Sequence, residues 1–434
     1  MPVNMLNLPS YIVKLLKEAE HDYQIETETK DHPNKCPHCK SANLVGFGHR
    51  RQMIKDLPMH GKHVGINVDT KRFQCKSCNK TFYESLPDVD VKRLMTNRLV
   101  SWIGKQAVRR TFASISEDVG INEATVRLVF RDYVNELERT VRFETPKWLG
   151  IDEIHLIKPR SVISNIKSNT IVELLPNRDK DAVINYLSQL DDHEHILYVA
   201  MDMWAPLKDA IEVALPQAKI IIDRHHVVKM VNEALDRFRK IFRLSLTPKQ
   251  RRGLMHDRVV LLKRESDLND KEALTLSGWL NKYPELGSAY RLKEEFFKIY
   301  DATSKEAALA KYTSWEKSIA PEVIDSFSDL ISAWHNWQPY ILNYFDRDNG
   351  KDTELAEENC SLTSGYTESL NNLNGIINRL GRGYSFEALR AKVLFAEGAL
   401  KKQIIKSLAE GKETVVHYGV DISTLIEMIE SGHI

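Results

Sequence analysis

The sequence predicts a multidomain α/β protein, and three observations support this fold class. Two Cys-x-x-Cys pairs, over residues 36–39 and 75–78, predict a small β-module held by a metal ion. Residues 196–226 show a strand–helix–strand pattern whose apolar runs are typical of buried parallel strands. Residues 224–350 then carry helical periodicity and no strand signal. A chain of 434 residues is long enough to bury several cores.

The composition is that of a soluble globular protein, with 42% hydrophobic and 28% charged residues. The formal net charge of +1 does not indicate a partner, but the distribution of charge does. Between Lys35 and Lys80, ten Lys or Arg residues stand against two Asp residues. Such a basic module in an otherwise neutral chain is typical of nucleic-acid binding.

The N-terminus predicts neither export nor membrane insertion. The apolar stretch over residues 6–16 is short and is followed by Lys17 and Glu18, unlike a signal peptide. No apolar run approaches the length of a membrane span. Four of the five cysteines form the two pairs and Cys360 stands alone, which is a pattern of metal binding rather than of secreted disulfides. We therefore expect a cytoplasmic protein with no membrane partner.

Residues 1–34 are expected to form a helix and a linker. Ser10 is a suitable N-cap for a helix over residues 9–20. Its apolar stripe would consist of Ile12, Leu15, Leu16 and Ala19. The polar stretch over residues 27–34 would then link this helix to the first cysteine.

Residues 35–90 are predicted to be a zinc ribbon. Each Cys-x-x-Cys pair makes a tight turn that points two thiolates at one ion, and the segments between the pairs alternate like strands. The four predicted ligands are Cys36, Cys39, Cys75 and Cys78. Four thiolates leave no open coordination position, so this Zn²⁺ would be structural. A redox Cys-x-x-Cys is the alternative, and His38 or His49 could substitute for one ligand.

Residues 91–146 are predicted to be a helix-turn-helix DNA-binding domain. Helices over 112–119 and 123–131 flank a turn in which Gly120 allows the chain reversal and Asn122 caps the second helix. The second helix would present its polar side chains to the major groove. The candidate DNA-binding residues are Thr125, Arg127 and Arg131 on this helix, with Arg50 and Arg51 in the basic ribbon. An ordinary helical hairpin is the alternative.

Residues 147–226 predict the first part of an α/β domain. Three strands over residues 148–175 precede a helix over 179–190, and the strand–helix–strand pattern follows. The order β-β-β-α-β-α-β is that of a ribonuclease-H-like fold. Asp152 lies in the middle of the first strand, Asp202 follows the fourth strand and Asp223 follows the fifth. Ligands bind at the carboxyl ends of such strands.

Residues 227–358 are predicted to be an all-helical insertion, and residues 359–434 to complete the ribonuclease-H-like domain and add C-terminal helices. The expected core of the insertion includes Trp279, Trp315, Trp334 and Trp337. After the insertion, a helix that begins near Thr367 carries Glu368. Gly381-Arg-Gly383 ends it before a further helix over residues 386–400.

The predicted fold brings three carboxylates together at one edge of the sheet: Asp152, Asp202 and Glu368. Carboxylate oxygens without thiolate or imidazole suit Mg²⁺ or Mn²⁺. Two such ions can activate a water or a 3′-hydroxyl and stabilise the leaving oxygen of a phosphodiester displacement. We therefore expect a catalytic two-metal site with these three ligands. Taken alone, Glu368 could be no more than a favourable charge at a helix start.

Several motifs, in order along the chain, together carry a resemblance to a known family. They are the two cysteine pairs, the helix-turn-helix, Gly150-Ile-Asp152-Glu, Asp202-Met-Trp204, Asp223-Arg-His-His226 and Thr367-Glu368-Ser-Leu-Asn-Asn372. From about Cys36 to Leu400, the chain resembles the ISL3 family of bacterial insertion-sequence transposases, which are DDE transposases.

The resemblance implies that Asp152, Asp202 and Glu368 form a DDE catalytic triad, with Asp223 and His226 in support. Such an enzyme binds double-stranded DNA at terminal inverted repeats, cleaves it and joins the freed 3′-hydroxyl to target DNA. Pairing two element ends implies at least a homodimer, associated with the nucleoid when it is bound to DNA. The family often has Gly after the glutamate, where this chain has Glu368-Ser-Leu-Asn371.

Two alternative functions share parts of this pattern. A non-catalytic DNA-binding regulator would use the zinc ribbon and the helix-turn-helix, with a degenerate nuclease-like domain that binds no divalent ion at Asp152. A structure-specific nuclease of similar fold would cleave DNA but join no strands. Metal titration and a strand-transfer assay separate the three functions.

Overall fold

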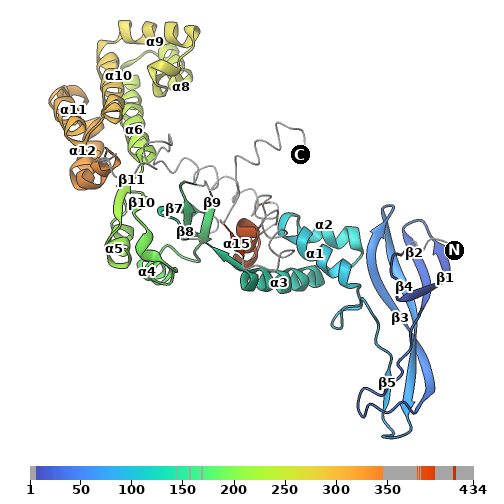
Figure 1. Ribbon diagram of the computed structural model, residues 1–434. Coiled ribbons are helices and arrows are strands. Elements are labelled where there is room, and N and C mark those ends of the chain that lie inside the picture. Colours follow the sequence, from blue (N-terminus) through green and yellow to red (C-terminus); the bar gives the residue numbers. More distant parts are fainter. Residues whose placement is uncertain are drawn as a thin grey trace. The chain divides into compact units, whose positions relative to one another are not determined.

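A computed structural model of the protein describes residues 6–143, 145–155, 158–167, 170–345, 379, 381, 383–395 and 414–416. The chain divides into two compact units (Figure 1). The first unit comprises Met1–Arg142, Asn378–Glu397 and Lys401–Val415. The second unit comprises Phe143–Ile377, Gly398–Leu400 and Val416–Ile434. Each unit is described by itself below.

The first unit begins with a five-stranded sheet. Its strands are β1 (Tyr11–Glu18), β2 (Asp22–Thr29), β3 (Leu44–Met59), β4 (Lys62–Cys75) and β5 (Thr81–Tyr83). The order is β1-β2-β4-β3, with β5 paired to β4. Strands β3 and β4 form one long hairpin that turns at His60 and Gly61, both of which have positive φ. Strand β2 pairs with β4 in parallel, and this contact joins β1 and β2 to the hairpin.

The helix predicted over residues 9–20 is wrong, because this segment is strand β1. The supposed apolar stripe is not buried: Ile12, Leu15 and Leu16 are each more than 40% exposed. Strand β1 instead pairs along its length with β2, whose burial alternates strictly between its two faces. That alternation is the period of a strand with one face in a core. Two of its four buried positions are Thr27 and Thr29, so hydrophobicity alone did not reveal the period.

Three helices follow the sheet in the first unit. They are α1 (Asn97–Arg109), α2 (Phe112–Val119) and α3 (Glu123–Thr140). The predicted helix-turn-helix is confirmed: Gly120 has a left-handed φ of 68° between α2 and α3, and Asn122 accepts a hydrogen bond from the amide of Ala124. Helix α3 is longer than the helix predicted over residues 123–131, and the short strand β6 (Val141–Phe143) follows it.

The first unit also contains helix α15 (Phe386–Phe395), from the far end of the chain. Residues 359–434 are predicted to complete the catalytic domain, and of these residues α15 packs within the first unit. Its contact with α1 is made by Lys392, which is 2% exposed. Its Nζ donates hydrogen bonds to the carbonyl oxygens of Ala107 and Arg110 at the end of α1. The other described C-terminal element is the short strand β12 (Thr414–Val416).

The second unit is built on another five-stranded sheet. Its strands are β7 (Trp148–His155), β8 (Pro159–Asn165), β9 (Thr170–Leu174), β10 (Tyr198–Met201) and β11 (Lys219–Ile222). Their order is β11-β10-β7-β8-β9, in which β10 is parallel to both neighbours and β7, β8 and β9 form an antiparallel meander. Helix α4 (Lys180–Ser188) leads into β10, and α5 (Ala205–Ala214) connects β10 to β11.

Helices follow the sheet of the second unit. They are α6 (Arg224–Phe242), α7 (Pro248–His256), α8 (Arg258–Leu262), α9 (Asp270–Lys282), α10 (Pro284–Phe297), α11 (Lys305–Lys317) and α12 (Pro321–Leu342). One hydrophobic core runs from the sheet into these helices and includes Trp315 and Trp334, whereas Trp279 and Trp337 are only partly buried. Asn343, just after α12, donates a hydrogen bond of 2.7 Å to the carbonyl oxygen of Ile220 in β11. In the described part of the chain, no helix is both long and apolar enough to cross a membrane.

Candidate metal and nucleic-acid sites

Four cysteine side chains converge at one end of the β3–β4 hairpin. The Sγ atoms of Cys36 and Cys78 lie 3.8 Å apart, and those of Cys39 and Cys75 lie 3.5 Å apart. All four sulfurs lie within 4.8 Å of one another. Sulfurs that hold a tetrahedral Zn²⁺ at about 2.3 Å are separated by about 3.8 Å. The donor set and its spacing therefore fit a structural zinc ion.

The backbone of the two cysteine turns supports the same conclusion. The residue after each second cysteine, Lys40 or Asn79, has a left-handed φ near 60°, so the two turns have the same form. The short sulfur contacts join one turn to the other rather than the two cysteines within a turn. A redox Cys-x-x-Cys would need a pairing within one turn. The arrangement thus favours a shared metal ion over the redox alternative.

The second candidate site lies on the sheet of the second unit, where three aspartates form a row across neighbouring strands. Ile151 pairs with Met201, and Met201 pairs with Ile222. The residue after each of these is an aspartate: Asp152, Asp202 and Asp223. Because β7, β10 and β11 are parallel and in this register, the three aspartates occupy equivalent positions on adjacent strands.

His226 completes this cluster through its contact with Asp202. The His226 Nε2 atom forms an ion pair with Asp202 Oδ1 and lies 3.9 Å from Asp223 Oδ2. Ligand atoms of Asp152, Asp202 and His226 all lie within 4.8 Å of one another. The structure therefore brings Asp202 and His226 into direct contact, and Asp152 beside them.

Asp223 differs from the other two aspartates because it is completely buried. Its carboxylate accepts a hydrogen bond of 3.0 Å from the amide of His225 and so caps helix α6. A capping carboxylate satisfies a backbone amide that the helix itself leaves without an acceptor. Through this cap, Asp223 sets where the first turn of α6 places His226.

Burial and charge perturb the ionisation of the cluster. Burial, assisted by the negative charge of Asp202, raises the pKa of Asp152 to about 6, against the opposing effect of the Glu153 amide. Burial by itself would lower the pKa of His226, but its hydrogen bond to Asp202 and the charges of the three aspartates raise it. The protein alone therefore favours extra protons at this site, where a divalent cation could replace them.

Two further acidic residues bear on this site, Glu368 and Glu153. Glu368, the predicted third ligand, lies outside the described residues. Glu153 forms an ion pair with Arg178, whose guanidinium carbon lies 4.8 Å from the centre of the Trp204 ring. Glu153 is thus engaged beside the cluster rather than in it. Sequence reasoning missed Arg178, which precedes α4 without any motif.

The predicted DNA-binding side chains of α3 do not all face solvent. Arg127 and Arg131 are exposed, whereas Thr125 is half-buried. Arg127 donates a hydrogen bond of 3.1 Å to Glu123, and its guanidinium lies 5.0 Å from the ring centre of Phe112. The exposed face of α3 and helix α15 together line a groove whose walls include Arg127, Leu128, Arg131, Ala388 and Arg390.

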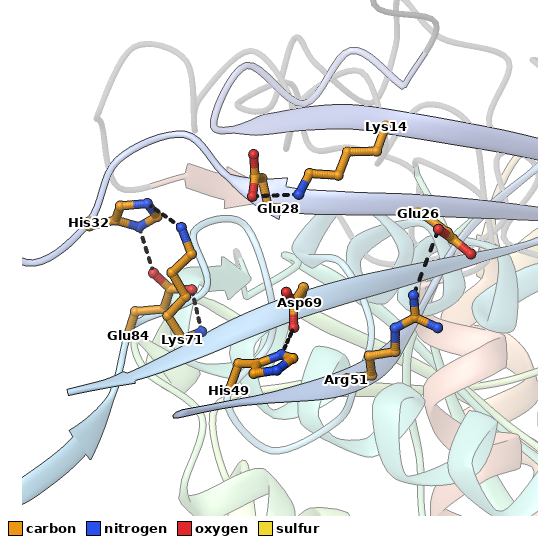
Figure 2. A network of polar contacts seen from close by, with 9 residues as sticks. All are labelled: Lys14, Glu26, Glu28, His32, His49, Arg51, Asp69, Lys71 and Glu84. Carbon is orange, nitrogen blue, oxygen red and sulfur yellow. Dashed lines mark hydrogen bonds and ion pairs between the residues drawn. The ribbon is translucent and has the colours of Figure 1, made fainter. Parts of the chain in front are cut away.

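The two predicted arginines of the ribbon also differ from each other. Arg51 lies 3.8 Å from Glu26, within a network of ion pairs that spreads over one face of the sheet (Figure 2). Arg50 instead stacks on Tyr83, with its guanidinium carbon 4.0 Å from the ring centre. The side chains of adjacent residues in a strand point to opposite faces of the sheet, so Arg50 and Arg51 lie on different faces.

These parts define a DNA-binding protein in which a four-cysteine module and a helix-turn-helix precede an α/β domain with an acidic cluster. Family models match the three parts in order. The zinc finger of the IS204/IS1001/IS1096/IS1165 transposases matches residues 32–78, and the helix-turn-helix domain of ISL3 transposases matches residues 84–134. The ISL3 transposase domain itself matches residues 149–393, more than half of the chain. The chain therefore belongs to the ISL3 family of transposases.

A similarity to one transposase supports the same family. The chain is 22% identical over 339 residues to the transposase for insertion sequence element IS1001 of Bordetella parapertussis. The similarity covers 76% of this chain and 80% of the relative. The likeness therefore extends through most of both proteins and is not confined to the DNA-binding modules.

Proposed function

We propose that this protein is a DDE transposase that binds the terminal inverted repeats of an insertion sequence and catalyses metal-dependent strand cleavage and strand transfer. The observation that carries this proposal is the close approach of Asp152 in β7 and Asp202, which directly follows the neighbouring parallel strand β10, within a chain of the ISL3 family. In this proposal the second unit is a ribonuclease-H-like catalytic domain, and residues 227–358 are its helical insertion.

The residues of the acidic cluster fit a divalent cation. Asp152 and Asp202 offer carboxylate oxygens, which Mg²⁺ and Mn²⁺ prefer, and Glu368 would add a third carboxylate. When bound, two such ions would supply charge stabilisation for a phosphodiester displacement by water or by a 3′-hydroxyl. His226 would hold one oxygen of Asp202 in place, and Asp223 would in turn hold His226 through the α6 cap. Both are positioning residues in this proposal.

The first unit would supply recognition of the element ends. The zinc ribbon and the helix-turn-helix would contact the terminal inverted repeats, with Arg127 and Arg131 on the exposed face of α3. Strand transfer joins two element ends to one target, so the active complex would contain at least two copies of the chain. The partners are therefore double-stranded DNA and a second copy of this protein.

Cleavage of a labelled duplex that carries an element end, in the presence of Mg²⁺, tests the catalytic assignment. We expect Asp152→Asn, Asp202→Asn and Glu368→Gln each to lower the cleavage rate by about a thousandfold or more, because each removes a ligand charge. DNA affinity should stay near wild type. Glu153→Gln is the matched control and should cleave normally, since Glu153 pairs with Arg178 outside the cluster.

Asp223 provides a graded comparison in the same assay. Asp223→Asn keeps a side chain that can cap α6, so measurable cleavage should remain. Normal cleavage by Asp202→Asn or Glu368→Gln would show that the catalytic assignment is wrong. Cleavage without joining would indicate a nuclease, and DNA binding without cleavage would indicate a DNA-binding regulator.

A further inference from the structure

Four side chains near the zinc end of the ribbon form a continuous stack, which we call the aromatic–arginine strip: Phe47, Arg72, Tyr83 and Arg50. The guanidinium carbon of Arg72 lies 5.3 Å from the ring centre of Phe47 and 5.5 Å from that of Tyr83. Arg50 lies on Tyr83 at 4.0 Å. Strands β3, β4 and β5 each contribute, so the stack depends on the folded sheet.

The strip lies at the end of the sheet's core face. Farther from the zinc end, this face of β3 and β4 carries Ile54, Ile66 and Val68, which are buried in the core of the unit. At the strip the same face is open: Phe47 is 49% exposed and Tyr83 is 38% exposed. Large aromatic rings exposed in this way contribute little to the core and commonly mark an interaction surface.

The charges of the strip are not neutralised by neighbouring acids. Within the described part of the chain, neither Arg50 nor Arg72 forms an ion pair with a carboxylate. The opposite face of the same strands is different, as Figure 2 shows: Arg51 contacts Glu26 at 3.8 Å, and His49 contacts Asp69 at 2.6 Å. The sheet thus has one neutralised face and one face with free positive charge.

The guanidinium group of Arg72, which is half-buried, is also held in a fixed position. Arg72 donates a hydrogen bond of 2.9 Å to the Thr81 hydroxyl and lies between two rings. Exposed arginines normally lose side-chain entropy when they bind a ligand, and this restraint reduces that loss. The planar fork of N–H donors on one guanidinium group matches the oxygen geometry of a phosphate.

We propose that the aromatic–arginine strip binds the sugar–phosphate backbone of double-stranded DNA, with Arg50 and Arg72 each contacting one phosphate. This inference deepens the proposed function, because it rests on DNA as the partner of the first unit. Each ring already has a guanidinium against it, which favours backbone contact over stacking of unpaired bases. Such contacts add affinity without reading sequence.

Equilibrium binding of the full-length protein to duplex DNA at several salt concentrations tests the strip. Each phosphate contact adds about 0.9 to the slope of log affinity against log salt. Arg50→Ala and Arg72→Ala should each reduce that slope by about one and weaken binding several-fold. The loss should be equal on an element-end duplex and on an unrelated duplex. Lys14→Ala is the matched control and should leave the slope unchanged, since Lys14 is paired with Glu28 at 2.7 Å in the network of Figure 2.

Zinc content and thermal unfolding establish that each variant is folded. Arg50 is exposed, so Arg50→Ala should leave the fold intact. If Arg72→Ala loses its zinc, the salt dependence of Arg50→Ala alone tests the proposal. Unchanged slopes in folded variants, or an equal loss in Lys14→Ala, would overturn the proposal, as would a loss confined to single-stranded DNA. Failure of the catalytic assignment would appear differently: wild-type protein would bind DNA with the strip-dependent slope but would not cleave it with Mg²⁺.

Discussion

At the scale of single residues, the ionisation of Asp152 makes the charge of the acidic cluster depend on pH. Its position on β7 beside Asp202 buries a carboxylate next to a second negative charge, which raises its pKa to about 6. The pKa of His226 is also raised, because the neighbouring aspartates favour its charged form. A cation that binds there must displace protons, so metal affinity and protonation are linked.

We therefore predict that Mn²⁺ affinity falls as the pH drops through about 6, by about tenfold for each pH unit below it. Above this pH Asp152 is ionised in the free protein, and a smaller further rise in affinity should follow the loss of the proton from His226, whose pKa is also raised. Calorimetric titration of the full-length protein with Mn²⁺ between pH 5 and pH 8 measures this dependence. An affinity that stayed constant over this range, or that persisted in Asp152→Asn, would contradict the assignment.

At the scale of elements, the buried side chain of Lys392 attaches helix α15 to the end of helix α1. Besides its two hydrogen bonds to carbonyls of α1, Lys392 lies 4.6 Å from the ring of Phe112 and 4.8 Å from the ring of Tyr384. It closes the carboxyl end of α1, where backbone carbonyls have no partner within the helix. Burial, with a contribution from Arg127, lowers its pKa to about 7.

Replacing Lys392 by Met should destabilise the first unit by about 1–3 kcal/mol, because two carbonyls lose their donor. The sign of the pH dependence follows from the lowered pKa. Between about pH 7 and pH 10 the unfolded chain binds the proton that the folded chain has released, so this lysine makes stability rise with pH. The difference in melting temperature between wild type and Lys392→Met should therefore widen from pH 7 to pH 9.

Scanning calorimetry of the full-length protein measures this difference. Lys293→Met is a useful control, because Lys293 is also buried and donates to two carbonyls, those of Leu261 and Lys263, but lies in the second unit. That variant should leave the transition of the first unit unchanged. A melting difference for Lys392→Met that does not vary with pH would show that Lys392 stays charged in the folded state.

At the scale of the whole molecule, the two units have separate cores and depend on different interactions. The apolar core of the ribbon contains residues of β1, β2, β3 and β4, and the zinc site holds the opposite end of the hairpin. The second unit has its own continuous core. The binding of a structural zinc ion contributes about 10 kcal/mol or more to the folding of small zinc modules.

Removal of zinc by a chelator should therefore lower the melting temperature of the first unit and weaken DNA binding, while the transition of the second unit stays unchanged. Metal analysis should give one zinc ion per chain before chelation. The control is Cys360→Ser, which alters the cysteine outside both pairs and should keep its zinc. DNA affinity that survives complete zinc removal would show that the ribbon does not depend on the metal.

The sequence by itself determined those elements whose characteristic residues all lie within one short stretch of the chain. The cysteine spacing identified the four thiolates, and Gly120 with Asn122 identified the helix-turn-helix. The apolar runs before Asp202 and Asp223 identified the parallel strands, because buried parallel strands need no alternation. In each case the residues themselves carry the chemistry or the backbone conformation.

Tertiary structure alone decided whatever depends on partners distant in the chain. Residues 9–20 have a helical stripe, yet they form a strand because β2 offers its edge. The positions of α15, of Arg72 against Phe47 and of Arg50 apart from Arg51 follow likewise from packing and strand register. A local pattern records the preference of a segment, but burial and pairing energies arise only when the neighbouring segment is present.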